Sequence, residues 1–305
     1  MDQLEGGRTL RIWTYRGYEV HVRLHLKPSL GHIALERLEP AHVQALLNRK
    51  LKEGLSPKSV LYIRSTLRSA LQQAVRWGYL TRNSAALVDG PRSERFDIKP
   101  LDADEARRLL EALEGDRLRA LYSVALTMGL RQGEALGLRW DDVDQVLGYL
   151  HIRKQLQRID GKFVLVDLKT SRSRRTLVMP GSVAVELQKH ASRQAEESHS
   201  RDRDPESFDL VFTRPDGAPL DGTVVSHQFH RVLAKAGLQQ RRFHDLRHSC
   251  ATLLLAQGVS PRVVMEILGH SQIALTMNTY THVLPELKRD AAERMDRVVK
   301  GELER

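Results

Sequence analysis

Hydrophobic residues in the first ninety positions recur at the three- and four-residue spacing of amphipathic helices. After Ser56-Pro57, a favourable helix start, they form one stripe: Val60, Ile63, Leu67, Leu71 and Ala74. Two earlier segments, about 14–27 and 40–52, are amphipathic as well. This pattern predicts a small bundle of helices.

Beyond residue 100 the pattern changes to helices mixed with short strands. Helical stretches are expected at 102–114, 116–128, 181–194, 223–236, 244–257 and 261–268. Runs of strand length cover 149–152, 163–166 and 175–178, and a polar turn over 170–173 separates the last two, which are expected to form a hairpin. The sequence therefore predicts a mainly α fold of the α+β class, in which a mostly helical domain with a small antiparallel β-sheet follows the helical bundle.

Turn-forming residues interrupt the helical pattern between residues 88 and 101. Asp89-Gly90-Pro91 and Lys99-Pro100 both disfavour a continuous helix. We therefore expect a domain over 1–90, a linker over 91–100 and a second domain over 101–305. The polar stretch 196–207, which mixes acidic and basic residues, is expected to be a mobile loop.

Positive charge is concentrated in the first third of the chain. The 305 residues include 48 Lys and Arg against 38 Asp and Glu, and residues 1–95 alone hold 16 basic and 8 acidic residues. Between Arg49 and Arg82 the only acidic residue is Glu53. A surface of one sign suits contact with nucleic-acid phosphates. Candidate DNA contacts are Lys58, Arg64 and Arg68, although a solvated helix face explains each of them equally well.

Several classes of protein are disfavoured. No apolar run approaches the ~20 residues that span a bilayer, and the N-terminus lacks the features of a secretory signal. Cys250 is the only cysteine, which excludes an internal disulfide framework and suits a reducing cytoplasm. No ATPase phosphate loop is present. His244 and His248 have the spacing of a zinc pair, but Asp245 stands where zinc peptidases have a glutamate, so we expect neither a metal nor another cofactor.

Six residues form a more coherent set of reactive side chains. They are Arg131 in Gly129-Leu130-Arg131-Gln132-Gly133-Glu134, Lys169 at the expected hairpin tip, His244 and Arg247 in His244-Asp245-Leu246-Arg247-His248, His270 after Leu268-Gly269, and Tyr280. The set contains no carboxylate pair for a two-metal nuclease. Several cations beside a phenol suit attack on a phosphodiester without a metal.

These segments, in this order and spacing over residues 100–290, resemble the catalytic boxes of the tyrosine recombinases of the phage-integrase family. The helical first third likewise resembles the core-DNA-binding domain of that family, a SAM-like helical bundle. The resemblance implies a site-specific recombinase that integrates or excises a mobile element without metal or ATP. Many relatives begin with a further domain for arm-type DNA sites, whereas here the core-binding pattern begins by about residues 8–11.

The resemblance also implies a role for each residue. Tyr280 would be the nucleophile that forms a 3′-phosphotyrosine, and His244 would be its acid/base partner. Lys169 would protonate the leaving 5′-oxygen. Arg131 and Arg247 would hold the non-bridging phosphate oxygens bidentately, and His270 would donate a further hydrogen bond.

The expected partners also come from the resemblance. They are double-stranded DNA attachment sites, other copies of the chain in a DNA-bound tetramer, and DNA-bending accessory proteins. The tail over 285–299 has apolar positions at helical spacing, and family members pack such a tail on a neighbouring protomer. A helix folded back on its own domain is the alternative.

Other interpretations of the same residues stay open. Arg131 could simply pair with Glu134, His270 could cap a helix, and Arg172, Arg174 or Arg175 could contact a phosphate instead of Lys169. The alternative functions are a DNA-binding regulator that does not cleave and a type IB topoisomerase, which shares the chemistry.

Overall fold

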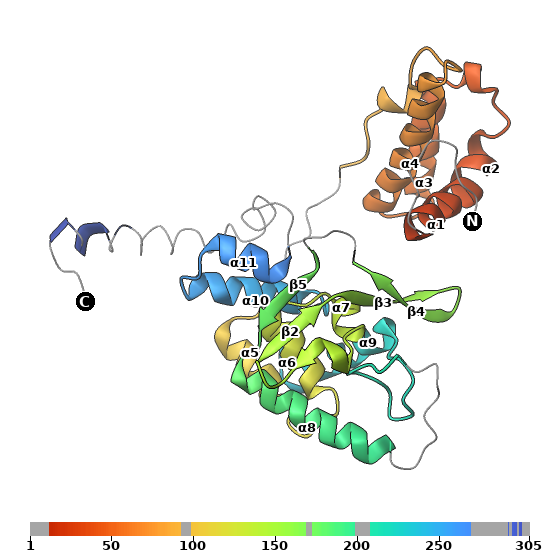
Figure 1. Cartoon of the computed structure of the whole chain (residues 1–305). Helices are drawn as coiled ribbons and strands as arrows, with labels where there is room; N and C mark the ends of the chain where they lie inside the picture. Colours follow the sequence, from red (N-terminus) through yellow and green to blue (C-terminus); the bar gives the residue numbers. More distant parts are fainter. Residues whose placement is uncertain are drawn as a thin grey trace. The chain divides into compact units, whose positions relative to one another are not determined.

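The computed structural model describes residues 12–92, 99–168, 173–198, 208–269, 292, 295–297 and 299–300. Contacts between residues divide the chain into two compact units, Met1–Phe96 and Asp97–Arg305, here called the N-terminal and C-terminal units. Figure 1 shows helices in the first unit, and helices together with short strands in the second. No helix in the described part of the chain is long and apolar enough to cross a membrane.

The N-terminal unit is a helical bundle. Its helices are α1 (Ile12–His21), a π-helical turn (Val22–Leu26), α2 (Lys27–Leu30), α3 (Pro40–Lys52) and α4 (Pro57–Arg76), with 3₁₀ turns at Leu35–Arg37 and Ser84–Ala86. The Ser56 hydroxyl accepts a hydrogen bond of 3.2 Å from the Ser59 amide and caps α4. The predicted stripe of α4 is buried, and its residues pack against Leu46 and Leu47 of α3.

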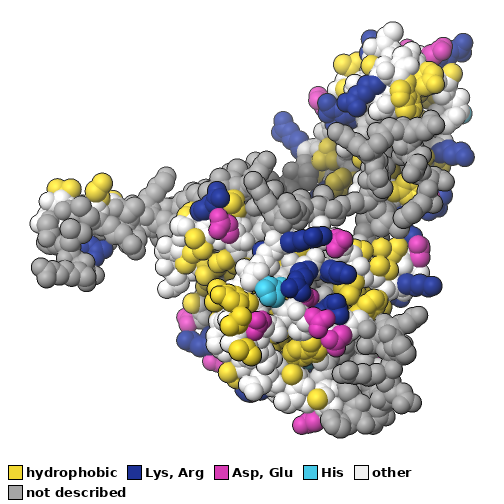
Figure 2. Space-filling model, viewed as in Figure 1, with side chains coloured by type: hydrophobic (Ala, Val, Ile, Leu, Met, Phe, Trp, Pro, Cys, Tyr) yellow, Lys and Arg dark blue, Asp and Glu magenta, His cyan; other side chains and the backbone are white. Residues whose placement is uncertain are grey.

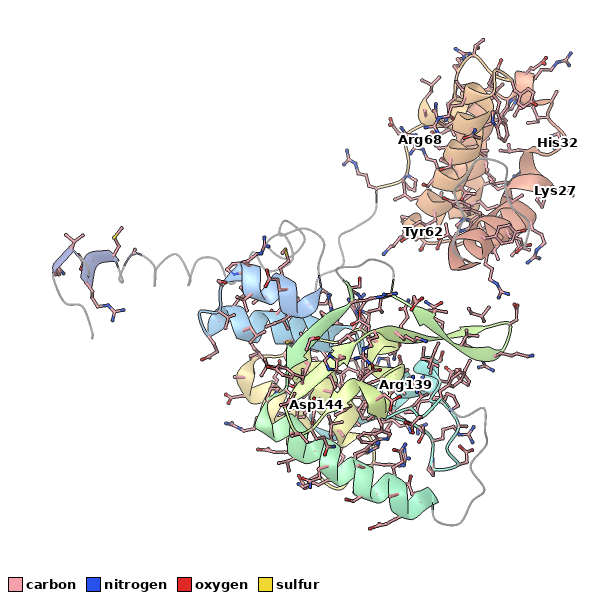
Figure 3. All side chains as sticks on the ribbon, in the orientation of Figure 1. Lys27, His32, Tyr62, Arg68, Arg139 and Asp144 are labelled. Carbon is pink, nitrogen blue, oxygen red and sulfur yellow. The ribbon has the colours of Figure 1, made fainter. Side chains whose placement is uncertain are left out.

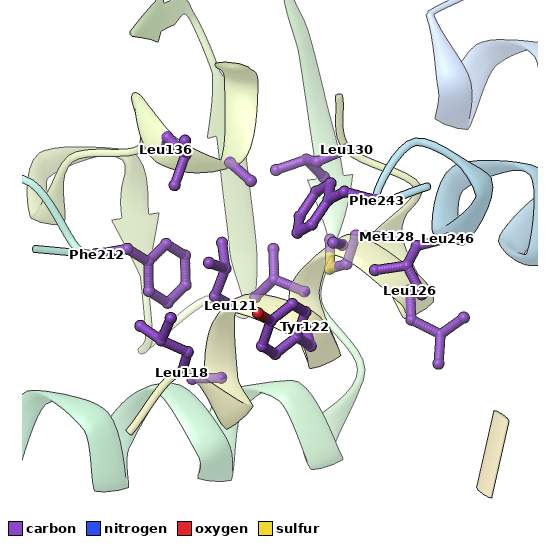
Figure 4. Packing of buried hydrophobic residues seen from close by; sticks show 14 of the residues in the cluster. Leu118, Leu121, Tyr122, Leu126, Met128, Leu130, Leu136, Phe212, Phe243 and Leu246 are labelled. Atoms are coloured by element: carbon purple, nitrogen blue, oxygen red, sulfur yellow. The ribbon is translucent and has the colours of Figure 1, made fainter. Parts of the chain in front are cut away.

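The helices of the C-terminal unit surround one buried helix. They are α5 (Ala103–Ala112), α6 (Arg119–Met128), α7 (Gln132–Leu136), α8 (Gly181–Ser198), α9 (Gly222–Lys235), α10 (Asp245–Ala256) and α11 (Pro261–Leu268). Nearly every residue of α6 is buried, which is typical of a helix packed on all sides. Tyr122 of α6 stacks on Phe229 with ring centroids 5.5 Å apart, and Figure 4 shows it among the buried residues around α6.

Among the described residues, five strands form two small antiparallel sheets. β1 (Val143–Asp144), β2 (Tyr149–Ile152) and β5 (Arg175–Val178) form one sheet in the order β1-β2-β5, and β3 (Lys154–Ile159) pairs with β4 (Lys162–Asp167). The predicted pairing of 163–166 with 175–178 was therefore wrong. The hairpin partner of β4 is β3, because Asp160 and Gly161 both have positive φ (52° and 79°) and form the tight turn between them.

Two other expectations needed correction. α8 continues to Ser198, so 196–198 are helical and not part of a loop, and Glu197 on α8 forms an ion pair with Arg117 (2.6 Å). The rest of the expected loop, 199–207, lies outside the described residues. The short helix α7 was not predicted, because its five residues are too few for a periodic pattern to be visible.

Candidate active site

Arg131 lies directly before α7, where the chain turns out of α6. Gly129 ends α6 in the left-handed conformation (φ 63°). The Arg131 amide donates to Glu134 Oε2 (3.0 Å) and its Nη1 donates to Oε1 (2.6 Å), so the expected ion pair with Glu134 is present. The Arg131 side chain nevertheless remains 36% exposed. Glu134 therefore orients this guanidinium without covering it.

Glu134 is a buried carboxylate shared by two arginines. Its side chain is 1% exposed, and its second ion pair is with Nη2 of Arg175 (3.0 Å). Burial alone would raise the pKa of Glu134, but Arg175, Arg131 and Arg247 together hold it below its ordinary value. Glu134 thus stays ionised and fixes the two arginines that contact it.

Arg247 on α10 is almost completely buried, with 2% exposed. Its Nη1 donates to the Gly129 carbonyl (2.7 Å), and its Nη2 donates to the Leu268 carbonyl. One guanidinium thereby holds together the C-terminal ends of α6 and α11. The expected bidentate phosphate contact would be made by this same guanidinium.

His244 precedes α10 and has an exposed side chain. The protein around the ring disfavours the imidazolium, and the positive charges of Arg247, Arg131 and Arg242 add to this, so the pKa of His244 lies below its ordinary value. His248, one turn later, has its ring centroid 5.1 Å away. Burial, together with the neighbouring His244, lowers the pKa of His248 to about 4.

The described structure brings three of the six predicted site residues together. Arg131 and Arg247 both approach the turn after α6 and the end of α11, because Arg131 Nη2 also makes a long contact with the Gly269 carbonyl (3.5 Å). Both arginines act electrostatically on His244. Lys169, His270 and Tyr280 lie outside the described residues, but their chain neighbours Leu168 and Gly269 are described.

The turn after α6 is closely packed. A Cβ built on Gly129 would lie 2.5 Å from Cδ2 of Leu268 and 3.2 Å from Sγ of Cys250. Burial raises the pKa of the Cys250 thiol to about 12, so this cysteine is an inert packing residue. No group of three or more potential metal ligands occurs among the described residues.

Arg175 was a candidate phosphate contact and proves to be an internal residue. Its side chain is 6% exposed, and it contacts Glu134. The neighbouring Arg174 is 60% exposed and lies 3.5 Å from Asp167. From the sequence alone these two arginines were equivalent. Figure 2 shows Lys and Arg side chains gathered on the face of the C-terminal unit that carries the sheets.

The three candidate DNA contacts of α4 differ from one another. Lys58 and Arg68 are exposed, and Figure 3 shows Arg68 on the same helix as Tyr62, whose side chain is 54% exposed. Arg64 instead donates from Nη2 to the Val88 carbonyl and is half-buried. Arg64 is therefore less accessible than Lys58 and Arg68, and its contact with DNA stays a prediction. Tyr62 follows Lys58 by one turn and therefore lies on the same helix face.

Comparison with known proteins agrees with this fold. The sequence model of the phage integrase family matches residues 99–286. A protein named tyrosine recombinase XerC-like from Caldanaerobacter subterraneus subsp. tengcongensis is 32% identical over 303 residues, covering 93% of this chain and 77% of that protein. An integrase from Saccharopolyspora erythraea is 28% identical over 342 residues, covering 94% and 78%.

Solved structures share the fold. The Tn1549 transposon integrase in complex with a circular intermediate DNA matches with a TM-score of 0.80 and 21% identity, covering 94% of this chain and 95% of that one. A lambda integrase dimer bound to a COC′ core site matches with a TM-score of 0.65 and 23% identity, covering 90% and 73%. The fold and the matches to integrases and tyrosine recombinases define a tyrosine recombinase. The chain belongs to the phage integrase family.

Proposed function

We propose that this recombinase cuts and rejoins double-stranded DNA at the attachment sites of a mobile element. The convergence of Arg131, His244 and Arg247 around the ends of α6 and α11 carries the proposal. Two guanidinium groups suit the charge that develops on a phosphodiester under attack. Beside them lies an exposed imidazole that can exchange a proton.

In the cleavage step one phosphorus–oxygen bond forms as another breaks, and one proton leaves as another is supplied. The Tyr280 oxygen attacks the scissile phosphorus, the bond from phosphorus to the 5′-oxygen breaks, and a 3′-phosphotyrosine remains. The phenol titrates near pH 10 and has to lose its proton, which His244 accepts. Because the pKa of His244 is lowered, its ring is neutral and able to do so at pH 7. Lys169 gives a proton to the 5′-oxygen. Religation is the reverse reaction with a different 5′-hydroxyl, so it consumes no ATP.

Arginines and His270 stabilise the transition state. Arg131 presents its exposed guanidinium to one non-bridging oxygen, and Glu134 fixes its orientation. Arg247, which joins α6 to α11, directs its guanidinium to the same phosphate. His270 follows Gly269, whose carbonyl contacts Arg131. A hydrogen bond from His270 to the phosphate completes the site.

The two domains of the chain divide the work of DNA binding and catalysis. Residues 1–90 form the core-DNA-binding domain, 91–100 the linker and 101–305 the catalytic domain with its tail helix. Lys58 and Arg68 on α4 contact the phosphates, which suits the charge excess of the first third. One of the similar solved structures is a lambda integrase tetramer bound to a Holliday junction. By analogy the chain forms a tetramer on DNA, and DNA-bending proteins assist it.

The decisive experiment looks for the covalent intermediate. The protein is incubated with attachment-site DNA in chelator, and covalent complexes are resolved on a denaturing gel. We expect complexes with the native chain, none with Tyr280→Phe, and a normal yield with Tyr149→Phe, since Tyr149 belongs to β2. Complexes that persist in Tyr280→Phe would contradict the assignment. Specific binding without any complex would indicate a regulator, and plasmid relaxation without strand exchange a topoisomerase.

A further inference from the structure

Arg242, which lies two residues before His244, is bound to a buried carboxylate. Its backbone amide donates to Oδ2 of Asp245 (2.8 Å), its Nη2 donates to Oδ1 (2.7 Å), and its Nε makes a longer contact with Oδ2 (3.3 Å). The Asp245 amide in turn donates to the Arg242 carbonyl (2.9 Å). These bonds close a turn of four residues, of which His244 is the third. The proposed catalytic roles leave Arg242 unused.

The same arrangement holds Arg131. There too a carboxylate three residues later binds both the backbone amide (3.0 Å) and the guanidinium (2.6 Å) of the arginine. In both pairs the carboxylate is buried, with 1% of the Glu134 side chain and 4% of the Asp245 side chain exposed. The arginine side chains stay 36% and 50% exposed. Each carboxylate therefore restricts the orientation of a guanidinium that solvent still reaches.

The preceding residue, Arg241, has the opposite environment. Its side chain is 7% exposed and forms an ion pair with Glu105 of α5 (2.7 Å). Its Nε also donates to the Lys99 carbonyl (2.8 Å). Arg241 is thus an internal anchor of the segment before α10, and of the two neighbouring arginines Arg242 is the one that a ligand from solvent can approach.

The segment that carries Arg242 has the charge that an anion requires. Between Asp221 and Asp245 the sequence contains four Lys and Arg and no acidic residue. Arg242 acts electrostatically on His244 together with Arg131 and Arg247, and these positive charges lower the pKa of the ring. Arg242 therefore lies near the group that is proposed to accept the proton of the nucleophile. A surface of this sign beside the site suits contact with DNA phosphates.

We propose that Arg242 binds a phosphate next to the scissile phosphate of the DNA, and that Asp245 orients its guanidinium for this contact. The inference rests on the proposed function and deepens it, because it adds a DNA contact at the same site. Arg131 and Arg247 are the two arginines proposed for the scissile phosphate, which leaves a neighbouring phosphate for Arg242. The planar fork of the guanidinium matches two oxygens of one phosphate.

The first measurement is the salt dependence of DNA binding by the full chain. Arg242→Gln should weaken binding to attachment-site DNA about 10-fold and reduce the slope of log affinity against log salt by about 1. Arg242→Lys keeps the charge and should restore the slope. The control is Arg107→Gln on α5, because Arg107 is 67% exposed and also pairs with a carboxylate three residues away, Asp104 (2.9 Å). Equal slopes for Arg242→Gln and the native chain, or equal reductions in Arg242→Gln and Arg107→Gln, would overturn the inference.

A scan with neutral phosphates identifies the phosphate that Arg242 contacts. Each duplex carries one methylphosphonate, which removes the charge of a single phosphate in the attachment site. At the contacted phosphate the change should weaken binding of the native chain about 10-fold and binding of Arg242→Gln less than about twofold, because two losses within one contact do not add. We expect this result at a phosphate next to the scissile one. Losses that multiply at every position would contradict the inference.

A purely structural role for Arg242 predicts a different pattern. Loss of the ion pair with Asp245 would lower the melting temperature and reduce the fraction of active protein equally for every duplex. Such a loss cannot distinguish one phosphate from the others. A lower melting temperature of Arg242→Gln together with multiplying losses at all positions would therefore make Arg242 a structural residue and overturn the inference.

The outcome is independent of the outcome for the proposed function, because both measurements report binding and not cleavage. If the native chain binds DNA but forms no covalent complex, the proposed recombinase activity fails, and a single position of non-additive loss still identifies the Arg242 contact. If covalent complexes form while losses multiply at every phosphate, the recombinase activity stands and the inference about Arg242 fails.

Discussion

His248 gives the C-terminal unit a pH-dependent stability. Its pKa is about 4 in the folded chain, against about 6.5 when unfolded, because burial disfavours the charged ring. Between these values unfolding takes up a proton. Stability should therefore fall as pH decreases from about 6.5 to 4 and change little, through this group, outside that window. His190, whose pKa is also lowered by burial, acts in the same direction.

The first prediction concerns the His248→Gln variant. Its melting temperature should fall less between pH 7 and pH 5 than that of the native chain, because one proton uptake is removed. Thermal unfolding followed by circular dichroism at several pH values measures this. The control is His230→Gln on α9, where the side chain is exposed. An unchanged pH profile in His248→Gln would assign the acid sensitivity to other groups.

At the scale of residues, the sequence predicted which reactive side chains lie together better than it predicted how buried each side chain is. The grouping of His244 with Arg247 follows from their spacing of three, which places both on one helix face. The burial of Arg175 beside an exposed Arg174 could not be predicted, since it depends on Glu134, which is 41 residues away. The half-burial of Arg64 could not be predicted for the same reason, because its acceptor is the carbonyl of Val88, 24 residues along the chain.

At the scale of elements, α7 and β3 touch through their backbones. A Cβ on Gly137 would lie 2.5 Å from the Leu156 nitrogen and 2.8 Å from the carbonyl carbon and Cα of Gln155. The φ of Gly137 is −94°, which any residue can adopt, so the close approach and not the backbone conformation requires glycine. This contact fixes the helix that follows Arg131 against the hairpin that leads to Leu168.

The second prediction is that Gly137→Ala forces β3 away from α7. Overpacking against backbone should lower the free energy of unfolding by about 1–3 kcal/mol and slow covalent complex formation. Urea unfolding and a cleavage time course measure the two effects. Gly181→Ala at the start of α8 is the control, because a Cβ there meets nothing within 4 Å. Equal free energies of unfolding for the two variants would show that β3 moves to accommodate the added methyl group without loss of stability.

Pairing of strands was the part of the fold that local patterns could not decide. The helices 40–52 and 261–268 were predicted with their observed bounds, because Pro40 and Ser260-Pro261 mark their starts. The strand 175–178 was also found, but its partner is 149–152. Choosing that partner requires knowledge of β3, whose polar sequence Lys-Gln-Leu-Gln-Arg-Ile hides its strand character. The Asp160-Gly161 turn was the available signal.

At the scale of the whole molecule, the uneven charge predicts how salt affects DNA binding. Lys58→Ala and Arg68→Ala should each weaken binding to all sequences and reduce the slope of log affinity against log salt by about 1. Arg64→Ala should lower stability and leave the slope unchanged, because that side chain binds Val88. Fluorescence anisotropy over a salt series measures the slopes. If the slope of Arg68→Ala equals that of the native chain, Arg68 does not contact DNA.

The separate cores predict separate unfolding. Leu67 belongs to the core of the N-terminal unit, and Leu121 belongs to that of the C-terminal unit. Calorimetry of the full chain should resolve two transitions. Leu67→Ala should lower the midpoint temperature of one transition and Leu121→Ala that of the other. Each substitution should reduce the free energy of unfolding of its own unit by about 2–5 kcal/mol. A single transition that both variants shift equally would mean that the units unfold together.

The buried thiol of Cys250 has a practical consequence for observing this molecule. It is the only cysteine in the sequence, and it packs against Gly129 at the end of α6 and contacts the Thr127 carbonyl. An alkylating dye should therefore leave the folded native chain unmodified, while a cysteine introduced on an exposed helix face takes the dye selectively. Fluorescent labels for single-molecule work can thus be placed without first removing Cys250, and slow reaction of Cys250 itself would time the opening of the contact between α10 and α6.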